Sequence, residues 1–218
     1  MSKSPGKVYL VGAGPGDPGL ITVKGMRLIG EADVIVYDHL VNQRILKYAQ
    51  PQTRMIDAGK QAGQKMLEQE AINRLLVKEA KSGRTVVRLK GGDPFIFGRG
   101  GEECEALAVR GIPFEVIPGV SSAVAAPAYA GIPLTHRACA SSVALVTGHE
   151  DPAKKAPTVD FKKLARAVDT VVCLMGVKTM ERTVRELRAG GAPPHTPVTV
   201  IEQGTYPHQR VVEGTLDT

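Results

Sequence analysis

Short apolar runs rich in valine and isoleucine alternate with segments of helical periodicity through the first half of the chain. The runs have the length of buried strands, and residues 68–82 have the amphipathic pattern of a helix that ends at Gly83. Strands that alternate with helices form right-handed βαβ units, and these build a mostly parallel sheet. The sequence therefore predicts an α/β fold, with strands at 8–11, 34–37, 54–57, 85–89 and 114–117.

The second half of the chain repeats this alternation. Its expected strands and helices lie at 143–147, 161–167, 170–175, 179–188, 198–201 and 210–212. Between the halves, Pro118 and Gly119 interrupt the pattern. We therefore expect two α/β domains, residues 1–117 and 118–218, with a ligand cleft between them.

Polar or glycine-rich residues follow each of the first four predicted strands. Gly12 and Gly14 follow the first strand, Asp38 the second, Lys60 the third and Gly91 the fourth. The carboxyl ends of parallel strands meet at one edge of a sheet, and ligands bind outside that edge. The sequence therefore predicts a binding site formed by these loops.

The stretch at 88–103 reads RLKGGDPFIFGRGGEE and contains five glycines. Glycine adopts positive φ angles easily and lets a ligand approach the backbone. A plain loop can have the same composition, so the glycines alone leave both interpretations open. The charged and aromatic residues among them favour a ligand site; they are Lys90, Asp93, Phe95, Phe97, Arg99, Glu102 and Glu103.

The loop after the first strand does not fit the nucleotide-binding motifs. Gly12 and Gly14 begin a dinucleotide fingerprint, but Asp17 occupies the position of its third small residue. Pro15 and Pro18 also remove backbone N–H groups that would bind a pyrophosphate. A P-loop is also excluded, because no glycine loop ends in Gly-Lys-Ser/Thr. These loops instead suit a ligand with a neutral or cationic body that backbone atoms contact.

Composition narrows the class of partner. The 218 residues carry a formal net charge of +6, which suits an anionic ligand, whereas scattered basic residues and 4% aromatic content argue against nucleic acid. No apolar run has the length of a membrane span, and no signal region precedes the first strand. The three cysteines lie far apart, and no residue spacing predicts a metal site. We expect a cytoplasmic protein without a metal, nucleic-acid or membrane partner.

Several motifs, in order, resemble the tetrapyrrole methylase family, and within it the members that methylate uroporphyrinogen III. These motifs are VGAGPGDP at 11–18, YDHL at 37–40, RLKGGDPFIFGRGGEE at 88–103, PGVSS at 118–122 and AGIPLTHR at 130–137. The similarity continues through Met175-Gly176 and Gly204-Thr205, so it covers nearly the whole chain. It implies a Rossmann-like parallel sheet in the N-terminal domain, an active-site cleft between the two domains and a homodimer.

The resemblance also implies a reaction and a set of site residues. S-adenosylmethionine would donate methyl groups to two ring carbons of uroporphyrinogen III, giving precorrin-2 on the route to sirohaem and cobalamin. The matching motifs place donor contacts at Pro15, Gly91, Gly92, Asp93, Ile96, Ser121, Ser122, Met175 and Gly204. They place catalytic positions at Asp38 and Lys60, and substrate contacts at Arg99, Glu102 and Arg137.

The expected chemistry needs neither a metal nor a covalent nucleophile, because a pyrrole carbon is electron-rich and a sulfonium methyl group is activated. Asp38 would accept a hydrogen bond from a pyrrole N–H, or the proton that the reaction releases. Lys60, Arg99 and Arg137, with Lys90 as a further candidate, would pair with the carboxylates of the substrate.

Structural alternatives to these roles stay open. Asp38 could cap a helix near Asn42, because aspartate often serves turns and caps. Lys60 could be a solvated loop lysine, and Ser121 and Ser122 could be ordinary N-caps.

Two other functions also stay open: a later-step precorrin methyltransferase of the same family, and a non-catalytic module that binds an anionic ligand. The long motif at 88–103 favours the first methylation step. The sequence departs from the family at Gln61, where a basic residue commonly follows the lysine. The family also usually continues beyond the position of Thr218 with a helix and a strand, so we expect a C-terminal domain that is truncated.

Overall fold

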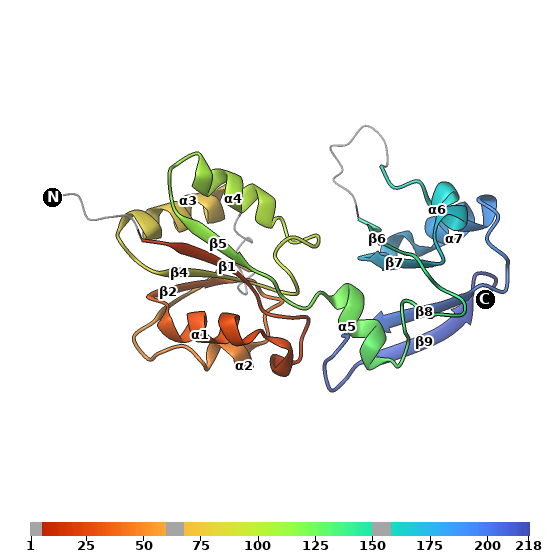
Figure 1. The fold of residues 1–218 in the computed structure, drawn as a ribbon, viewed down its shortest axis with the longest axis horizontal. Coiled ribbons are helices and arrows are strands. Elements are labelled where there is room, and N and C mark those ends of the chain that lie inside the picture. Colours follow the sequence, from red (N-terminus) through yellow and green to blue (C-terminus); the bar gives the residue numbers. More distant parts are fainter. Residues whose placement is uncertain (1–5, 60–67, 150–157) are drawn as a thin grey trace. The chain divides into compact units, whose positions relative to one another are not determined.

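The computed structural model describes residues 6–59, 68–149 and 158–218. The chain divides into two units, Met1–Ser122 and Ala123–Thr218, which we call unit 1 and unit 2 (Figure 1). The division falls at the first residue of helix α5 (Ser122–Tyr129), shortly after Pro118.

Unit 1 contains a five-stranded sheet in the order β3-β2-β4-β1-β5, and all of its neighbouring strands run parallel. The strands are β1 (Val8–Gly12), β2 (Val34–Tyr37), β3 (Arg54–Asp57), β4 (Val86–Lys90) and β5 (Phe114–Ile117). The predicted α/β fold with a parallel sheet is therefore confirmed. After β1 the chain continues to β2 and β3 on one side of the sheet, and after β4 it continues to β5 on the other side. The direction of strand addition therefore reverses between β1 and β4, and parallel sheets of this kind bind ligands at such a point.

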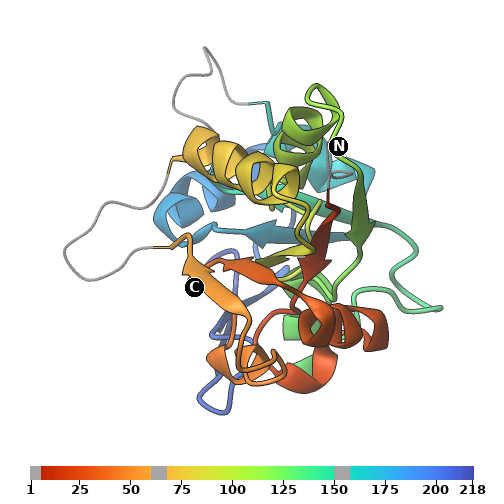
Figure 2. The same cartoon turned by 90° about the vertical axis from the view of Figure 1, so that its left-hand side faces the viewer.

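Helices cover both faces of this sheet, as Figures 1 and 2 show. On one face lie α1 (Val23–Glu31) and α2 (Gln43–Leu46), and on the other lie α3 (Gln69–Lys81) and α4 (Gly100–Ala108). Alternate residues of a strand point to opposite faces. Val8 and Leu10 accordingly pack in the core beneath α3 and α4, whereas Val11 packs in the core beneath α1 and α2.

The helix after β1 begins where the sequence predicts a cap. Thr22 Oγ1 accepts a hydrogen bond from Gly25 N at 3.1 Å and so caps α1. A 3₁₀ turn, η1 (Pro18–Leu20), precedes this cap. The turn η1 was not predicted, because so short a segment shows no periodicity, whereas α2 lies where the sequence allowed a helix near Asn42.

Unit 2 contains two small sheets. In one, β6 (Val143–Thr147) and β7 (Thr170–Leu174) run parallel; in the other, β8 (Pro197–Glu202) and β9 (Arg210–Thr215) form an antiparallel hairpin. The helices are α5, α6 (Phe161–Ala167), the 3₁₀ turn η2 (Val177–Thr179) and α7 (Met180–Ala189). Arg166 Nε donates a hydrogen bond to Gly190 O at 2.6 Å and joins α6 to the end of α7.

Glu115 joins β5 to the start of β1 and to α1. Its carboxylate accepts a hydrogen bond from Lys7 Nζ at 2.7 Å and also pairs with Lys24 of α1. The hydrogen bonds from Lys24 and then Lys7 lower the pKa of Glu115 from 4.5 to about 2. A carboxylate with a lowered pKa in the folded state stabilises the fold above its unfolded pKa, and this contribution is lost as the pH falls toward the folded value.

We therefore expect Glu115→Gln to be less stable than the parent protein at neutral pH, with a difference that shrinks as the pH falls from 4.5 toward 2. Urea unfolding at several pH values would measure the difference. The effect should be small, because both lysines are partly exposed. A difference that stays constant across this range would show that the ion pairs do not cause it.

Candidate functional site

Three loops meet at the carboxyl edge of the unit 1 sheet, and glycines let their backbones touch. Gly14 N donates to Gly92 O at 3.2 Å, and Gly92 N donates to Gly14 O at 2.8 Å. A Cβ atom added to Gly119 would lie 2.3 Å from Gly92 O and 2.6 Å from Gly12 Cα. A side chain does not fit at such distances, so these glycines bring the three loops together.

Asp93 ties the loop after β4 to the loop after β5. Its Oδ1 accepts hydrogen bonds from Phe95 N at 2.8 Å and Ile96 N at 3.1 Å, and its Oδ2 accepts one from Gly119 N at 3.0 Å. All three donors belong to the backbone of unit 1. Asp93 therefore shapes the loops of the site, and its contact with a methyl donor stays a prediction.

Asp38 follows β2 and lies beside Arg88 of β4. Arg88 Nη2 donates a hydrogen bond to Asp38 Oδ1 at 2.5 Å, and the Asp38 side chain is 27% exposed. The cap of α2 is Asn42, whose Oδ1 accepts a hydrogen bond from Arg44 N at 3.0 Å. The capping alternative for Asp38 is therefore wrong.

Asp38 belongs to a group of charged residues between the sheet and α4, which we call the buried charge cluster: Asp38, Arg88, Lys90 and Glu103. Glu103 Oε1 accepts hydrogen bonds from Arg88 Nε at 2.9 Å, Lys90 Nζ at 3.1 Å and Gln69 Nε2 at 3.1 Å. Arg88, Lys90 and Glu103 are buried. Lys90 was expected as a candidate to pair with a substrate carboxylate. In this structure its ammonium group is buried against Glu103 instead.

The sequence predicted no role for Arg88, and Glu103 was expected only among the charged residues that favour a ligand site. Arg88 and Lys90 follow Val86 on the face of β4 that packs toward α3 and α4, since alternate residues share a face. Two cations at alternate positions of a wholly buried strand were a signal that a carboxylate faces them, because buried charges are normally paired. The sequence could not say which carboxylate it is.

The cluster changes the pKa of its two cations in opposite directions. Burial lowers the pKa of Lys90, and repulsion by Arg88 lowers it further, although Glu103 and Asp38 act against this. Burial also lowers the pKa of Arg88, but the attraction of Glu103 and Asp38 outweighs it, so that pKa is raised. Arg88 is thus the permanent positive charge of the cluster, and Lys90 loses its proton more easily than an exposed lysine.

Arg99 and Glu102, two predicted substrate contacts, pair with each other at the start of α4. Arg99 Nε and Nη2 donate to Glu102 Oε1 and Oε2 at 2.8 and 2.7 Å. Both side chains are more than half exposed, and Arg99 has a left-handed backbone with φ of 58°. Their contact with a substrate stays a prediction, and a substrate carboxylate would share or displace the bond to Glu102.

Three predicted site residues lie in unit 2. Met175 follows β7 with φ of 57° and a half-exposed side chain. Gly204 packs on α5, since a Cβ atom added there would lie 2.5 Å from Ala126 Cβ. Arg137 is exposed in a turn. Lys60, the second predicted catalytic residue, lies outside the described residues.

Residues 7–218 match the family model of Tetrapyrrole (Corrin/Porphyrin) Methylases. The chain belongs to this family. The resemblance drawn from the motifs is therefore confirmed.

Known members of the tetrapyrrole methylase family include close relatives. The chain is 54% identical over 216 residues to the S-adenosyl-L-methionine-dependent uroporphyrinogen III methyltransferase of Methanosarcina barkeri, covering 99% of this chain and 85% of the relative. The uroporphyrin-III C-methyl transferase of Thermus thermophilus, solved with S-adenyl homocysteine, has a TM-score of 0.82 at 42% identity, covering 97% of this chain and 84% of that one. A cobalt precorrin-4 methyltransferase has a TM-score of 0.84 at 31% identity, covering 96% and 85%.

The loops of unit 1 suit the methyl donor that the family implies. Gly92 has φ of 67°, in the left-handed region that favours glycine, and a Cβ atom added there would be in ordinary van der Waals contact with its nearest neighbours. The nearest atoms are Ser121 Cα and Ser122 N, at 3.9 and 4.0 Å. Backbone atoms of Gly92, Ser121 and Ser122 thus lie side by side at the carboxyl edge of the sheet, where a ligand held mainly by backbone groups would meet them. The donor contacts at Pro15, Gly91 and Ile96 stay predictions.

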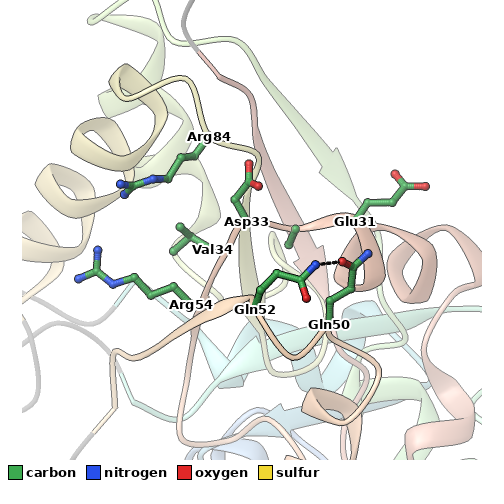
Figure 3. A pocket seen from close by; sticks show the side chains of 8 residues that line it. Glu31, Asp33, Val34, Gln50, Gln52, Arg54 and Arg84 are labelled. Carbon is green, nitrogen blue, oxygen red and sulfur yellow. Dashed lines mark hydrogen bonds between the residues drawn. The ribbon is translucent and has the colours of Figure 1, made fainter.

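A pocket of about 410 Å³ lies at the opposite, amino edge of this sheet (Figure 3). Its lining includes Glu31, Asp33, Gln50, Gln52, Arg54 and Arg84. Arg54 and Arg84 both pair with Glu79 of α3, and Gln52 donates a hydrogen bond to Gln50. Parallel sheets of this topology bind ligands at the carboxyl edge, and both arginines of this pocket are already paired with Glu79, so we assign the pocket a structural role.

Within residues 6–59, 68–149 and 158–218, no group of histidine, cysteine and carboxylate side chains is arranged to hold a metal ion. None of the helices in these ranges is both long and apolar enough to cross a membrane. Cys104, Cys139 and Cys173 are free thiols.

Proposed function

We propose that the protein catalyses the S-adenosylmethionine-dependent methylation of uroporphyrinogen III at two ring carbons, giving precorrin-2 for sirohaem and cobalamin biosynthesis. The observation that carries this proposal is the 54% identity, over 99% of the chain, to a relative named for this methyl transfer. The family resemblance also leads us to propose a homodimer that works in the cytoplasm.

The sequence favours the first methylation over a later one. The fold does not separate them, because the TM-scores are 0.82 for the uroporphyrin-III enzyme and 0.84 for the cobalt precorrin-4 enzyme. Sequence identity favours the first step, because it is 42% to the uroporphyrin-III enzyme and 31% to the cobalt precorrin-4 enzyme. A non-catalytic module for anionic ligands would leave the Asp38–Arg88 pair without a use, and we do not favour it.

Bound S-adenosylmethionine supplies an activated methyl group, so the protein has to align the substrate and exclude water. Asp38 lies at the carboxyl edge with Oδ1 bound by Arg88, and its Oδ2 makes no hydrogen bond with any described residue. Oδ2 can accept a hydrogen bond from a pyrrole N–H, or take its proton as the methylated ring becomes an imine. The carboxylates on the rim of the substrate repel Asp38, so we place the interior of the macrocycle against it.

Basic residues outside the cluster would hold the rim of the substrate. Arg137 is exposed and pairs with no carboxylate of the described chain, whereas Arg99 is engaged with Glu102. Arginine binds carboxylates in bidentate fashion, so we propose Arg137 as the stronger anchor and Arg99 and Lys60 as further ones.

Asp38→Asn is expected to lower the turnover by at least about tenfold while leaving donor binding intact, because it removes a positioned acceptor but keeps the shape of the side chain. Steady-state kinetics and calorimetric titration with S-adenosylhomocysteine would measure the two quantities. Asp33→Asn is the matched control, since Asp33 Oδ2 accepts a hydrogen bond from Thr85 N at the amino edge. Unchanged turnover in Asp38→Asn would show that Asp38 has only a structural role.

Methyl transfer from a labelled donor tests which tetrapyrrole the protein uses. The purified protein would be offered uroporphyrinogen III and a later cobalamin precursor in separate assays under reducing conditions. Faster labelling of uroporphyrinogen III supports the proposal, and faster labelling of the later precursor supports the alternative enzyme. Binding of both without labelling would support the non-catalytic module.

A further inference from the structure

We propose that Arg88 is a positioning residue of the reaction: it holds Asp38 Oδ1 and thereby leaves Oδ2 directed at the substrate. This inference rests on the proposed function. It gives a role to a buried arginine that touches neither the substrate nor the methyl donor.

The contacts of Arg88 fix its guanidinium group from three sides. Nε donates to Glu103 Oε1 of α4 at 2.9 Å, and Nη2 donates to Asp38 Oδ1 at 2.5 Å. Nη1 lies 3.4 Å from the carbonyl oxygen of Val36 in β2. Arg88 and Glu103 are at most 2% exposed, so neither can rotate into solvent. Asp38 is thus held by a group that is itself held by packing and by a second carboxylate.

The backbone of Asp38 is fixed as well. Asp38 N donates to Leu89 O of β4 at 3.2 Å, and Asp38 O accepts from Val41 N at 3.1 Å. The remaining freedom of this residue is therefore rotation of its side chain. The bond from Arg88 removes that freedom, which is the action expected of a positioning residue.

Charge balance also ties Asp38 to the cluster. Without Asp38, the cluster contains two cations, Arg88 and Lys90, and one carboxylate, Glu103. An excess positive charge in a buried place is unfavourable, and the Asp38 carboxylate offsets it. On the neighbouring strand, Asp57 lies beside Tyr37 in register, so its side chain points to the face of the sheet opposite that of Asp38. Among the described residues, the charges that face Asp38 are therefore those of β4 and α4.

A double-mutant cycle tests whether Arg88 acts through Asp38. Arg88→Gln in the parent protein is expected to lower kcat by about tenfold or more, with an unchanged KM for the methyl donor. In the Asp38→Asn background, the same substitution should change kcat by less than about twofold, because the group that Arg88 positions is already absent. Equal effects of Arg88→Gln in both backgrounds would overturn the proposal, since a merely structural role acts independently of Asp38.

Arg84→Gln is the matched control for the cycle. Arg84 also pairs with a buried carboxylate, that of Glu79, but at the opposite edge of the sheet. The Arg84→Gln substitution should leave kcat and the KM for the methyl donor near their parent values in both backgrounds. If Arg88→Gln fails to fold, Arg88→Lys takes its place: a lysine keeps the charge but cannot bind Glu103 and Asp38 through separate nitrogens. Loss of kcat that depends on Asp38 then supports the proposal, and parent-like kcat overturns it.

A spectroscopic measurement separates this inference from the proposed function. The carboxyl ¹³C resonance of Asp38 can be assigned from its absence in Asp38→Asn. It should move in Arg88→Gln and stay in place in Arg84→Gln, whatever substrate the protein uses. If the resonance moves as expected but uroporphyrinogen III is not methylated, the proposed function fails while the Asp38–Arg88 contact stands. If methylation proceeds and the resonance does not move, the positioning role of Arg88 is wrong.

Discussion

Gly119→Ala is expected to destabilise unit 1 by at least about 3 kcal/mol and to abolish methyl transfer. The added Cβ atom would lie 2.3 Å from Gly92 O and 2.6 Å from Gly12 Cα. Both neighbours are backbone atoms, so no side chain can rotate away to make room. The loops after β1 and β4 would have to separate, and the bonds between Gly14 and Gly92 would be lost with them.

Gly101→Ala is the control for this prediction. Gly101 lies in the first turn of α4, and a Cβ atom added there would meet nothing within 4 Å. Alanine favours helix over glycine, so this variant should be as stable as the parent or more stable by up to about 1 kcal/mol. Urea unfolding of both variants would decide. Parent-like stability of Gly119→Ala would mean that the three loops do not meet as described.

Glu103→Gln is expected to cost about 3 kcal/mol of unfolding free energy, because it leaves Arg88 and Lys90 buried without their shared carboxylate. The loss should depend on pH. Burial already lowers the pKa of Lys90, and removing the attraction of Glu103 lowers it further. The unfolded chain then holds a proton that the folded chain has lost, so the stability of the variant should rise as the pH is raised from neutral toward the unfolded pKa of lysine.

Two further variants show whether charge causes this loss. Lys90→Met in the Glu103→Gln background removes one unpaired cation and should recover part of the stability. Glu79→Gln provides the matched control, because Glu79 is equally buried but its partners Arg54 and Arg84 are partly exposed and can be hydrated. We expect its cost to be about 1 kcal/mol. Equal costs for the two glutamate variants would contradict the account of the buried charge cluster.

The sequence predicted most strands of unit 1 closely, because the residues that define and bound each strand are neighbours in the chain. The runs that became β2 (Val34–Tyr37) and β5 (Phe114–Ile117) are short and mainly apolar, and aspartates bound the first while prolines bound the second, so their ends could be found without tertiary information. The start of α4 at Gly100 does not follow from the sequence. Gly100 and Gly101 are poor helix formers, and only the contacts of the folded loop put them in the helix.

The meaning of the glycines could not be predicted from their composition. Gly12 and Gly92 suggested loops open to a ligand, and Gly119 suggested a break in the strand pattern, yet Gly12 and Gly119 are required because the backbones of separate loops touch there. Gly92 favours glycine for a different reason, because its φ of 67° lies in the left-handed region. The difference depends on contacts between residues far apart in the chain, which a single sequence does not reveal.

The candidate site was predicted in part. The position of Asp38 at the carboxyl end of a strand followed from the parallel sheet, but its partner Arg88 did not, because the pairing joins two strands and a helix. Lys90 was expected as a further candidate to pair with the carboxylates of the substrate, although it ends a strand that is buried throughout. An alternating pattern of charge in such a strand predicts internal pairing better than ligand binding.

The most direct test of the proposed function is the mass of the product. Purified protein would be incubated under reducing conditions with S-adenosylmethionine and uroporphyrinogen III, and the tetrapyrrole would then be oxidised and weighed by mass spectrometry. The account predicts a product that has gained two methyl groups, and a much smaller yield of it with Asp38→Asn. Recovery of unmodified tetrapyrrole alone, from folded protein that binds S-adenosylhomocysteine, would contradict it.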